Sequence, residues 1–525
     1  MILEAESETV RTDPWNSGPW AAATLALLTL AALALRLWGL THQSLWIDEM
    51  FTLKYAGVDQ SLTWENVRIN LQGPLHSVLL HVWSSLFGWG EASIRLPQAI
   101  VSAATVPMLY AASRPVFGER RALLAAALLA VNPFHVWYAQ EVRNYAFVIF
   151  LATLSLWVLQ GIDGARRPLA RVPALAATWL AGMLFNLSFA FHAAAGALWG
   201  AVRWRRDRAR LAVLGLTGVV VVIALLPWEV GFYQRWVSKS YLLKTEPVPE
   251  EVKLRGEATA PVLGIPYAMY AFSVGFSLGP SLRELRRAPS PSTAAAHPWA
   301  VGATAVCFGT LAVAGGAQWI RGNDARRRLW LLALLVPLLL AFLAATRNLK
   351  VFNPRYVAVG LPIYMVALAE GVFALRPRWL GDGLLAGVAI LCGVSLVQLH
   401  TEPRYWKEDA RSAAKVLRAE MRPEDLLFVV GTCDPLTRYY WPELRSRHVV
   451  RRFEVPIRKP PQGDLEREAV GAIEQPGRTF VLFYREDFHD PDGRWEAFLK
   501  DRFAIERRWD FVGTRVWLLG PEKRS

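Results

Sequence analysis

The most reactive feature of the sequence is a pair of adjacent acids in a short apolar run. Asp48 and Glu49 lie between Leu45 and Phe51, where every other residue is apolar. An acid pair on a wet loop is ordinarily just solvated, but burial among these side chains would raise a carboxyl pKa and suit a general base. The same pair could instead hold a divalent metal ion. Asp48 and Glu49 are therefore the first catalytic candidates.

A second polar cluster closes an apolar stretch at residues 132–145. It contains Glu141, Arg143 and Tyr145, and helical spacing would put Glu141 and Tyr145 about one turn apart. Arginine is a natural partner for a phosphate or a carboxylate. The alternative is a helix-end cap with interfacial aromatic residues. We expect Glu141 to bind substrate and Arg143 and Tyr145 to bind a phosphate.

A third cluster at residues 347–356 opens another apolar stretch and contains Lys350, Arg355 and Tyr356. Cations held at this end of a span imply an anionic partner, and a lipid phosphate or pyrophosphate fits that depth. General binding of lipid headgroups is the alternative. His76, in a short segment that begins Gly73-Pro74, could hydrogen-bond a substrate.

The elements that would position these residues are membrane helices. Hydrophobic residues make up 53% of the 525 residues, and apolar stretches recur at about 20 residues, enough to cross about 30 Å of hydrocarbon. Irregular chain cannot do this, because unpaired backbone amides in lipid are costly. Clear examples are Trp20 to Leu40, Val301 to Ile320, Leu329 to Thr346 and Leu380 to Leu399.

The formal net charge of +14 is concentrated in short loops between spans, which is typical of topology signals and argues against a nucleic-acid partner. Placing those loops in the cytoplasm predicts about eleven spans, with thirteen as an alternative. The segments Leu75 to Phe87 and Pro261 to Leu278 are then expected to lie at the interface or re-enter. The basic loops are Arg120 and Arg121, Arg166 to Arg171, Arg203 to Arg210, Arg321 to Arg328, and Arg376 with Arg378.

This topology predicts three parts. Residues 1–18 form a cytoplasmic segment, residues 19–400 form the transmembrane module with extracytoplasmic loops 41–95 and 228–297, and residues 401–525 form an extracytoplasmic domain. In that last part helical spacing over Asp409 to Met421 and Trp495 to Phe503 alternates with strand-like runs at 426–430, 479–484 and 515–519, which predicts an α/β domain. It has no glycine-rich dinucleotide turn and no P-loop.

Five motifs together resemble a known family. They are Leu45 to Glu49, Gly73 to His76, Arg95-Leu96-Pro97, Asn132 to Tyr145, and Pro354-Arg355-Tyr356. Over residues 20 to 400 they resemble bacterial membrane glycosyltransferases of the protein O-mannosyltransferase and aminoarabinose transferase type, the glycosyltransferase family 39-like group, which share the GT-C fold. The single Pro74 departs from the two prolines usual in that family.

The resemblance implies transfer of a sugar from a polyprenyl-phosphate-linked donor to a lipid, glycan or protein acceptor at the extracytoplasmic face of the cell inner membrane. It assigns the general base to Asp48, with Glu49 beside it, and phosphate binding to Arg355 and Tyr356. It leaves a divalent metal cofactor open. Two other functions remain possible: a transporter or flippase for lipid-linked sugars, and an assembly protein in which the acid pair is incidental.

Overall fold

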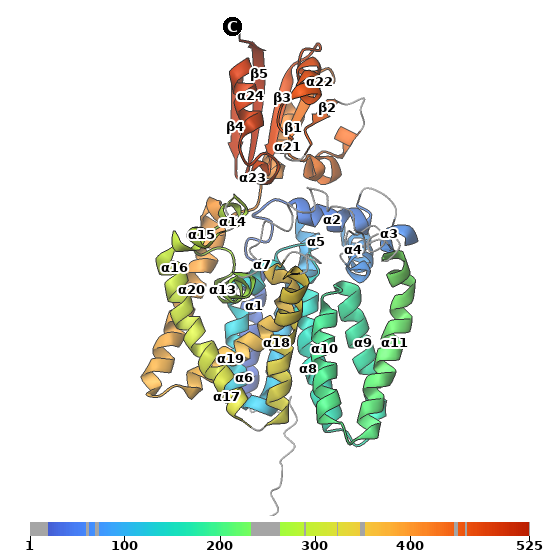
Figure 1. Ribbon diagram of the computed structural model, residues 1–525, viewed down its shortest axis with the longest axis vertical. Coiled ribbons are helices and arrows are strands. Elements are labelled where there is room, and N and C mark those ends of the chain that lie inside the picture. The colour runs from blue at the N-terminus through green and yellow to red at the C-terminus, as the bar shows by residue number, and fades with distance from the viewer. Residues whose placement is uncertain are drawn as a thin grey trace, which may run out of the picture.

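The computed structural model describes residues 19–58, 62–68, 73–232, 263–287, 290–322, 324–346, 352–445, 450–456 and 459–523. They form a helical bundle with a smaller, sheet-containing domain on one end of it (Figure 1). The predicted phosphate ligand Lys350 and the N-terminal segment 1–18 lie outside the described residues.

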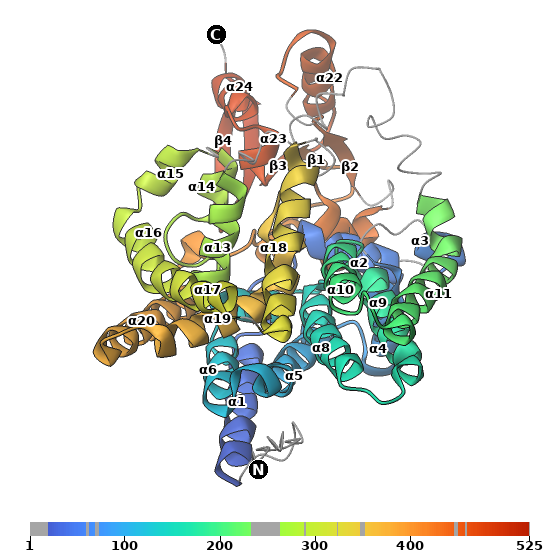
Figure 2. The same ribbon diagram turned by 60° about the horizontal axis from the view of Figure 1, so that its bottom comes forward.

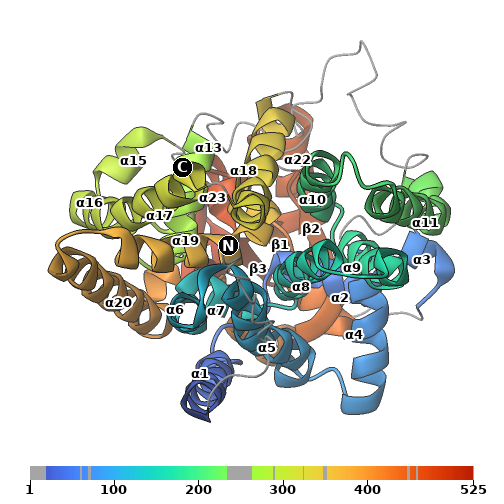
Figure 3. The same ribbon diagram turned by 90° about the horizontal axis from the view of Figure 1, so that it is seen from below.

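Apolar helices of spanning length build the bundle. Among the described residues, eight helices are long and apolar enough to cross a membrane, and the bent pair α6 and α7 raises the number to nine. Two more helices, α5 (Glu91–Phe117) and α10 (Phe189–Arg203), lie in the same bundle (Figure 3) but are not among these nine, so the number of about eleven spans stays a prediction. The eight are α1 (Pro19–Leu37), α8 (Tyr145–Asp163), α9 (Val172–Phe185) with the turn before it, α11 (Arg208–Phe232), α16 (Pro298–Thr304) continued by α17 (Thr310–Arg321), α18 (Ala325–Thr346), α19 (Leu361–Ala374) with the turn Pro354–Gly360, and α20 (Arg378–Thr401).

Several short helices lie at the end of the bundle that carries the sheet domain. Two of them, α4 and α13, run across the bundle axis (Figures 1 and 3). They correspond to the two apolar segments that the charge pattern assigned to the interface, and they do not cross the bundle. The short helices are α2 (Ile47–Ala56), α3 (Trp64–Arg68), α4 (Pro74–Phe87), α13 (Gly264–Val274), α14 (Leu282–Arg287) and α15 (Pro291–Ala295).

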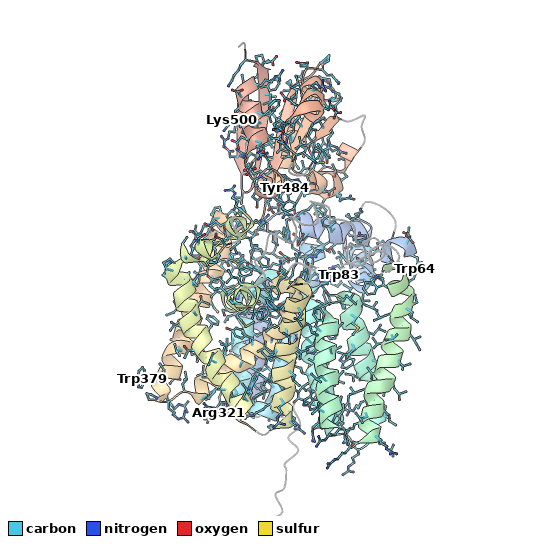
Figure 4. The ribbon with its side chains drawn as sticks, viewed as in Figure 1. Trp64, Trp83, Arg321, Trp379, Tyr484 and Lys500 are labelled. Carbon is cyan, nitrogen blue, oxygen red and sulfur yellow. The ribbon has the colours of Figure 1, made fainter. Side chains whose placement is uncertain are left out.

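The basic loops gather at the opposite end. Ion pairs connect them: Asp163 lies 3.1 Å from Arg203 and 3.8 Å from Arg326. Glu370 pairs in the same way with Arg121 and Arg327, at 3.2 and 3.6 Å. Figure 4 shows Arg321 at this end and Tyr484 of the sheet domain beyond the other. The predicted alternation of loop charge along the chain is therefore correct.

The break between α6 (Glu119–Ala130) and α7 (Pro133–Ala139) directs the chain toward the acid pair. The two helices meet at 55°. Pro133 begins α7, and the Asn132 side chain caps it by accepting from the His135 amide at 2.9 Å. The buried guanidinium of Arg36 in α1 donates to the carbonyls that end α6, at Ala130 (2.9 Å) and Leu129 (3.3 Å). These contacts satisfy backbone groups that a broken helix leaves unpaired.

Two glycines allow α17 and α19 to pack in close contact. A methyl group on Gly315 would lie 1.9 Å from the Ala367 carbonyl oxygen, and one on Gly371 would lie 2.0 Å from that of Leu311. Small residues at such contacts let membrane helices approach closely.

Replacing Gly315 by Leu is therefore expected to destabilise the protein by about 3 kcal/mol, because the backbone of α19 must move away. Gly316→Leu is the matched control, since nothing lies within 4 Å of a methyl group there. Thermal unfolding in detergent measures both variants. Equal melting temperatures for the two would contradict the close packing.

The C-terminal domain contains a five-stranded sheet in the order β2-β1-β3-β5-β4. β1 pairs in parallel with β2 and β3, whereas β5 is antiparallel to β3 and β4. Helix α21 (Ala410–Glu420) and the central strands agree with the sequence prediction, but β2, β4 and α22 (Gly463–Ile473) were not predicted because their apolar patterns are weak. The strands are β1 (Leu426–Val430), β2 (Arg451–Glu454), β3 (Thr479–Tyr484), β4 (Phe503–Phe511) and β5 (Thr514–Glu522), and the other helices are α23 (Glu486–His489) and α24 (Arg494–Arg502).

The sheet domain is attached directly to the segment that carries the acid pair. Ile47 is part of its hydrophobic core. The Ser44 hydroxyl donates to the Glu408 carbonyl oxygen at 2.8 Å, and the Tyr440 hydroxyl accepts from the Leu45 amide at 2.7 Å. α2 therefore lies between the bundle and the domain (Figure 2). Tyr484, the last residue of β3, lies at the edge that faces the bundle (Figure 4).

Candidate functional site

Asp48 lies in the first turn of α2 and forms an ion pair with Arg355, which lies 307 residues further along the chain. Arg143 approaches the same turn, because it donates to the Asp48 carbonyl oxygen at 2.8 Å and to the Thr52 hydroxyl at 3.1 Å. The Asp48 and Arg355 side chains remain 18% and 21% exposed, so a ligand can reach them. Three of the predicted site residues therefore meet in one place.

Two tyrosines surround the arginines of this site. The Arg355 guanidinium lies 5.3 Å from the Tyr356 ring centre and 6.0 Å from that of Tyr145. Arg143 lies 5.7 Å from the Tyr145 ring. Such rings attract cations and fix the plane of a guanidinium. The Asn353 side chain accepts from the Arg355 amide at 3.1 Å and so starts the turn that carries Arg355 and Tyr356.

The electrostatics of Asp48 differ from the sequence expectation. Burial alone would raise the pKa of Asp48, but the guanidinium groups of Arg355 and Arg143 outweigh it and hold this pKa well below its usual range. The expectation of a raised pKa is wrong for Asp48 because it considered burial without the arginines. Asp48 is ionised at neutral pH.

Glu49 does not act as a pair with Asp48, because the two carboxylates point to different partners. Arg95 of α5 binds both oxygens of Glu49, at 3.1 and 3.0 Å, and the Val142 amide donates to one of them at 2.8 Å. Both charged side chains are buried, with 0% exposure for Glu49 and 1% for Arg95. Burial would raise the pKa of Glu49, but Arg95 and Lys407 lower it further than burial raises it. Glu49 thus joins α2 to α5 and to the loop after α7.

The position of Glu141 also differs from the prediction. It lies in the turn between α7 and α8, not on one helix with Tyr145, and it faces Lys407 at 3.0 Å and the Trp137 indole at 2.8 Å. Burial raises the pKa of Glu141, and Lys407 offsets this only in part. Lys407 was not among the sequence candidates, since nothing in its local sequence marks a cation that reaches back to the bundle.

His76 is buried in α4, between α5, α8 and α9. Its ring lies 3.2 Å from the Gln98 amide nitrogen and beside Phe147 and Phe185. Burial, with the charge of Arg143, lowers the pKa of His76 to about 3, so the ring is neutral at physiological pH. Substrate binding by His76 stays a prediction.

Within the described part of the chain, no three side chains of His, Cys, Asp or Glu lie together as a metal site would require. A metal ion at the acid pair stays a prediction.

Comparisons with known proteins agree with this architecture. A family described as dolichyl-phosphate-mannose-protein mannosyltransferase matches residues 72–228. A putative mannosyltransferase of Bacillus subtilis, YkcB, is 31% identical over 101 residues, which are 19% of this chain. The chain spans only 14% of the length of that relative.

Solved structures with the same fold cover nearly the whole chain. ArnT from Cupriavidus metallidurans bound to undecaprenyl phosphate matches 95% of this chain and 98% of its own, with a TM-score of 0.56 and 14% identity. The oligosaccharyltransferase AglB from Archaeoglobus fulgidus, in complex with an inhibitory peptide and a dolichol-phosphate, matches 95% of this chain and 74% of its own, with a TM-score of 0.51 and 11% identity. The resemblance drawn from the sequence is therefore confirmed: the chain has the GT-C fold of these solved structures, and its residues 72–228 match the dolichyl-phosphate-mannose-protein mannosyltransferase family.

Proposed function

We propose that this protein is a glycosyltransferase that moves a sugar from a polyprenyl-phosphate-linked donor to an acceptor. The observation that carries the proposal is the meeting of Asp48 with Arg355 and Arg143 at a partly exposed site. In such an arrangement the carboxylate can take a proton from a nucleophile while the two guanidinium groups bind a phosphate leaving group. Solved relatives of the same fold bind undecaprenyl phosphate and dolichol-phosphate, which supports this class of donor.

In the proposed reaction Asp48 removes the proton from an acceptor hydroxyl or amine. The acceptor oxygen or nitrogen forms a bond to the anomeric carbon, the bond from that carbon to the phosphate oxygen breaks, and the electron pair leaves with the phosphate. Attack from the side opposite the phosphate inverts the configuration. Arg355 and Arg143 stabilise the charge that grows on the leaving phosphate.

The ion pair between Asp48 and Arg355 gives this reaction an order of events. With Arg355 bound to it, Asp48 is a weak base, because its pKa is held low. A donor phosphate competes for the same guanidinium, and neutralising that charge lets the pKa of Asp48 rise toward its ordinary value. Donor binding thus prepares the base before the acceptor reacts.

The proposed orientation follows from the position of the basic loops. They lie at the end of the bundle opposite the sheet domain, and the bias of Lys and Arg toward cytoplasmic loops assigns that end to the cytoplasm. The site and the C-terminal domain would then face the extracytoplasmic side of the inner membrane, where the acceptor is a lipid, glycan or protein.

Arg355→Lys is expected to lower the rate of transfer by about 100- to 1,000-fold, by analogy with loss of a single transition-state donor. Lysine keeps the charge but not the planar fork that lies over Tyr145 and Tyr356. Initial rates at saturating donor measure the effect. Arg321→Lys, at the other end of the bundle, serves as the control (Figure 4). A rate for Arg355→Lys within a few-fold of wild type would remove Arg355 from the proposed transition state.

Turnover by the purified protein in lipid tests the function itself. A panel of polyprenyl-phosphate sugars serves as donors, and a crude envelope extract supplies acceptors. Transfer or slow hydrolysis of one donor would support the enzyme and identify its sugar. Saturable donor binding without turnover, together with movement of donor across the bilayer, would favour the flippase instead.

A further inference from the structure

A pocket lies beside the proposed site, where the bundle meets the C-terminal domain. Its walls come from four segments: Trp46 before α2, Trp137 of α7, α14, and the connection from α20 to the domain. Asp48 is only two residues from Trp46, in the first turn of α2. Its polar side chains include Arg283, Arg286, Arg404, Trp406, Lys407 and Glu408.

Three buried polar atoms on this lining have no hydrogen-bond partner among the described residues. They are the indole nitrogens of Trp46 and Trp406 and the Oε2 atom of Glu408. Polar atoms withdrawn from water are costly when unpaired, and those of native proteins are nearly always satisfied by protein, water or ligand. Two N–H donors and a carboxylate acceptor in one pocket therefore indicate a ligand that both donates and accepts.

Two of the four positive charges of the pocket are paired with carboxylates. Lys407 binds Glu141 at 3.0 Å and lies 5.8 Å from the ring of Trp46 and 5.2 Å from that of Trp137. Arg286 binds the other oxygen of Glu408 at 2.8 Å. The remaining two cations are also engaged, Arg283 with the Pro403 carbonyl at 2.8 Å and Arg404 with Tyr405. All four cations are held by other groups, and the unpaired atoms are two N–H donors and a carboxylate oxygen, which would repel a phosphate but can bind a neutral polar group.

The chemistry of the lining identifies the ligand class. A hydroxyl group donates one hydrogen bond and accepts others. Indole rings add flat apolar surface beside the polar atoms, as in sites for amphipathic ligands. The volume of the cavity is about 20 Å³, which suits one or two hydroxyl groups but not a whole ring.

We infer that this pocket is a subsite for hydroxyl groups of a sugar ring, read by the Trp46 and Trp406 indoles and the Glu408 carboxylate. The inference rests on the proposed function. It deepens that function by giving the chain a sugar-recognition element outside the Asp48, Arg143 and Arg355 cluster. The ring belongs either to the donor or to a glycan acceptor, since both offer the same hydroxyl groups.

Binding of a small glycoside tests this subsite without requiring turnover. The full chain in lipid nanodiscs is titrated with methyl α-D-mannopyranoside, and binding is followed by saturation-transfer NMR. Trp406→Phe keeps the ring but removes its N–H, and is expected to weaken binding about 5-fold. Glu408→Gln keeps the shape but removes the charged acceptor, and is expected to weaken binding about 10-fold.

Trp330→Phe is the matched control. Its indole nitrogen is also buried and unpartnered among the described residues, but it lies in α18 against Phe117, away from the pocket. Thermal unfolding of every variant separates lost binding from lost folding. If Glu408→Gln fails to fold, binding by Trp406→Phe still tests the subsite.

Three results together would support the subsite. Glycoside binding is saturable and is not displaced by inorganic phosphate. Both pocket variants weaken it, whereas the control variant retains it. Competition by a sugar-loaded polyprenyl phosphate, but not by the sugar-free lipid, would assign the pocket to the donor sugar. Competition only by acceptor glycan would assign it to the acceptor. Absence of saturable binding, displacement by phosphate, or equal binding by Trp406→Phe and wild type would overturn it. Glycoside binding without transfer would retain the subsite and reject the glycosyltransferase.

Discussion

Asp48→Asn is expected to lower sugar transfer by about 10²- to 10⁴-fold, because asparagine cannot accept the proton of the acceptor. The variant should still fold, since Asp48 is partly exposed and its backbone contacts with Arg143 do not involve the carboxylate. Initial rates with a saturating polyprenyl-phosphate sugar measure the effect. Asp382→Asn changes an exposed acid on α20 in the same way and serves as the control.

Donor binding distinguishes a general base from a residue that only holds the donor. Asp48→Asn should bind the donor at least as tightly as wild type, because Arg355 loses its carboxylate partner and becomes free to bind phosphate. Wild-type activity is not expected to fall through titration of free Asp48 between pH 8 and 5, since its pKa is held well below that range. A transfer rate for Asp48→Asn close to wild type would end the assignment of Asp48 as base.

Glu49→Gln is expected to destabilise the protein by about 3 to 5 kcal/mol, the usual cost of breaking a buried ion pair from one side. The amide cannot neutralise Arg95, which is 1% exposed and would keep an uncompensated charge. Thermal unfolding in a fixed detergent measures the loss. Glu119→Gln is the matched control, because Glu119 is 43% exposed and its pair with Arg114 at 3.5 Å is a surface pair.

The double variant Glu49→Leu with Arg95→Leu separates charge from packing. Removing both charges should recover part of the stability lost in the single variant, since no ion is then left unpaired. Activity should stay low, because Arg95 also donates hydrogen bonds to the Leu40 and Gln43 carbonyl oxygens, at 2.9 Å each, just before the acid pair. Leucine cannot replace these bonds. A single variant as stable as the surface control would show that this ion pair does not hold α2 in place.

Acid should weaken the same region. The folded-state pKa values of Asp48 and Glu49 both lie below their usual values near 4, so protons bind more weakly to the folded protein than to the unfolded chain. Their contribution to stability is complete above the pKa values of the unfolded chain, and it is lost as the pH falls through the pKa values of the folded protein. For these two groups we expect a melting temperature that is level above about pH 5 and declines below about pH 4. For Glu49→Gln the decline should be smaller.

The C-terminal domain contributes side chains to the pocket beside the proposed site. Lys407 and Glu408 contribute to the walls beside Asp48, and Ile47 is buried in the core of the domain. Deleting the residues after Thr401 would therefore remove side chains from the site and expose Ile47. Single changes such as Trp406→Phe are the cleaner way to ask what the domain does.

The sequence by itself determined the membrane bundle, because apolar stretches of spanning length have few alternatives in lipid. It also determined which ends of the helices share a side, since the basic loops alternate along the chain. The central strands β1 and β3 could be predicted because both faces are buried, which makes them continuously apolar. β2 and β4 could not, since both are largely exposed and rich in charged residues, as loops are.

Only the tertiary structure decided what each charged residue does. Asp48 and Glu49 are neighbours in sequence, but successive residues of a helix point about 100° apart, and the fold supplies Arg355 to one and Arg95 to the other. Local sequence indicated burial and therefore a raised pKa for the acid pair, whereas arginines from distant segments lower the pKa of both carboxyl groups. The role of Lys407 could not be predicted from its local sequence for the same reason, because its partner Glu141 lies hundreds of residues away in the chain.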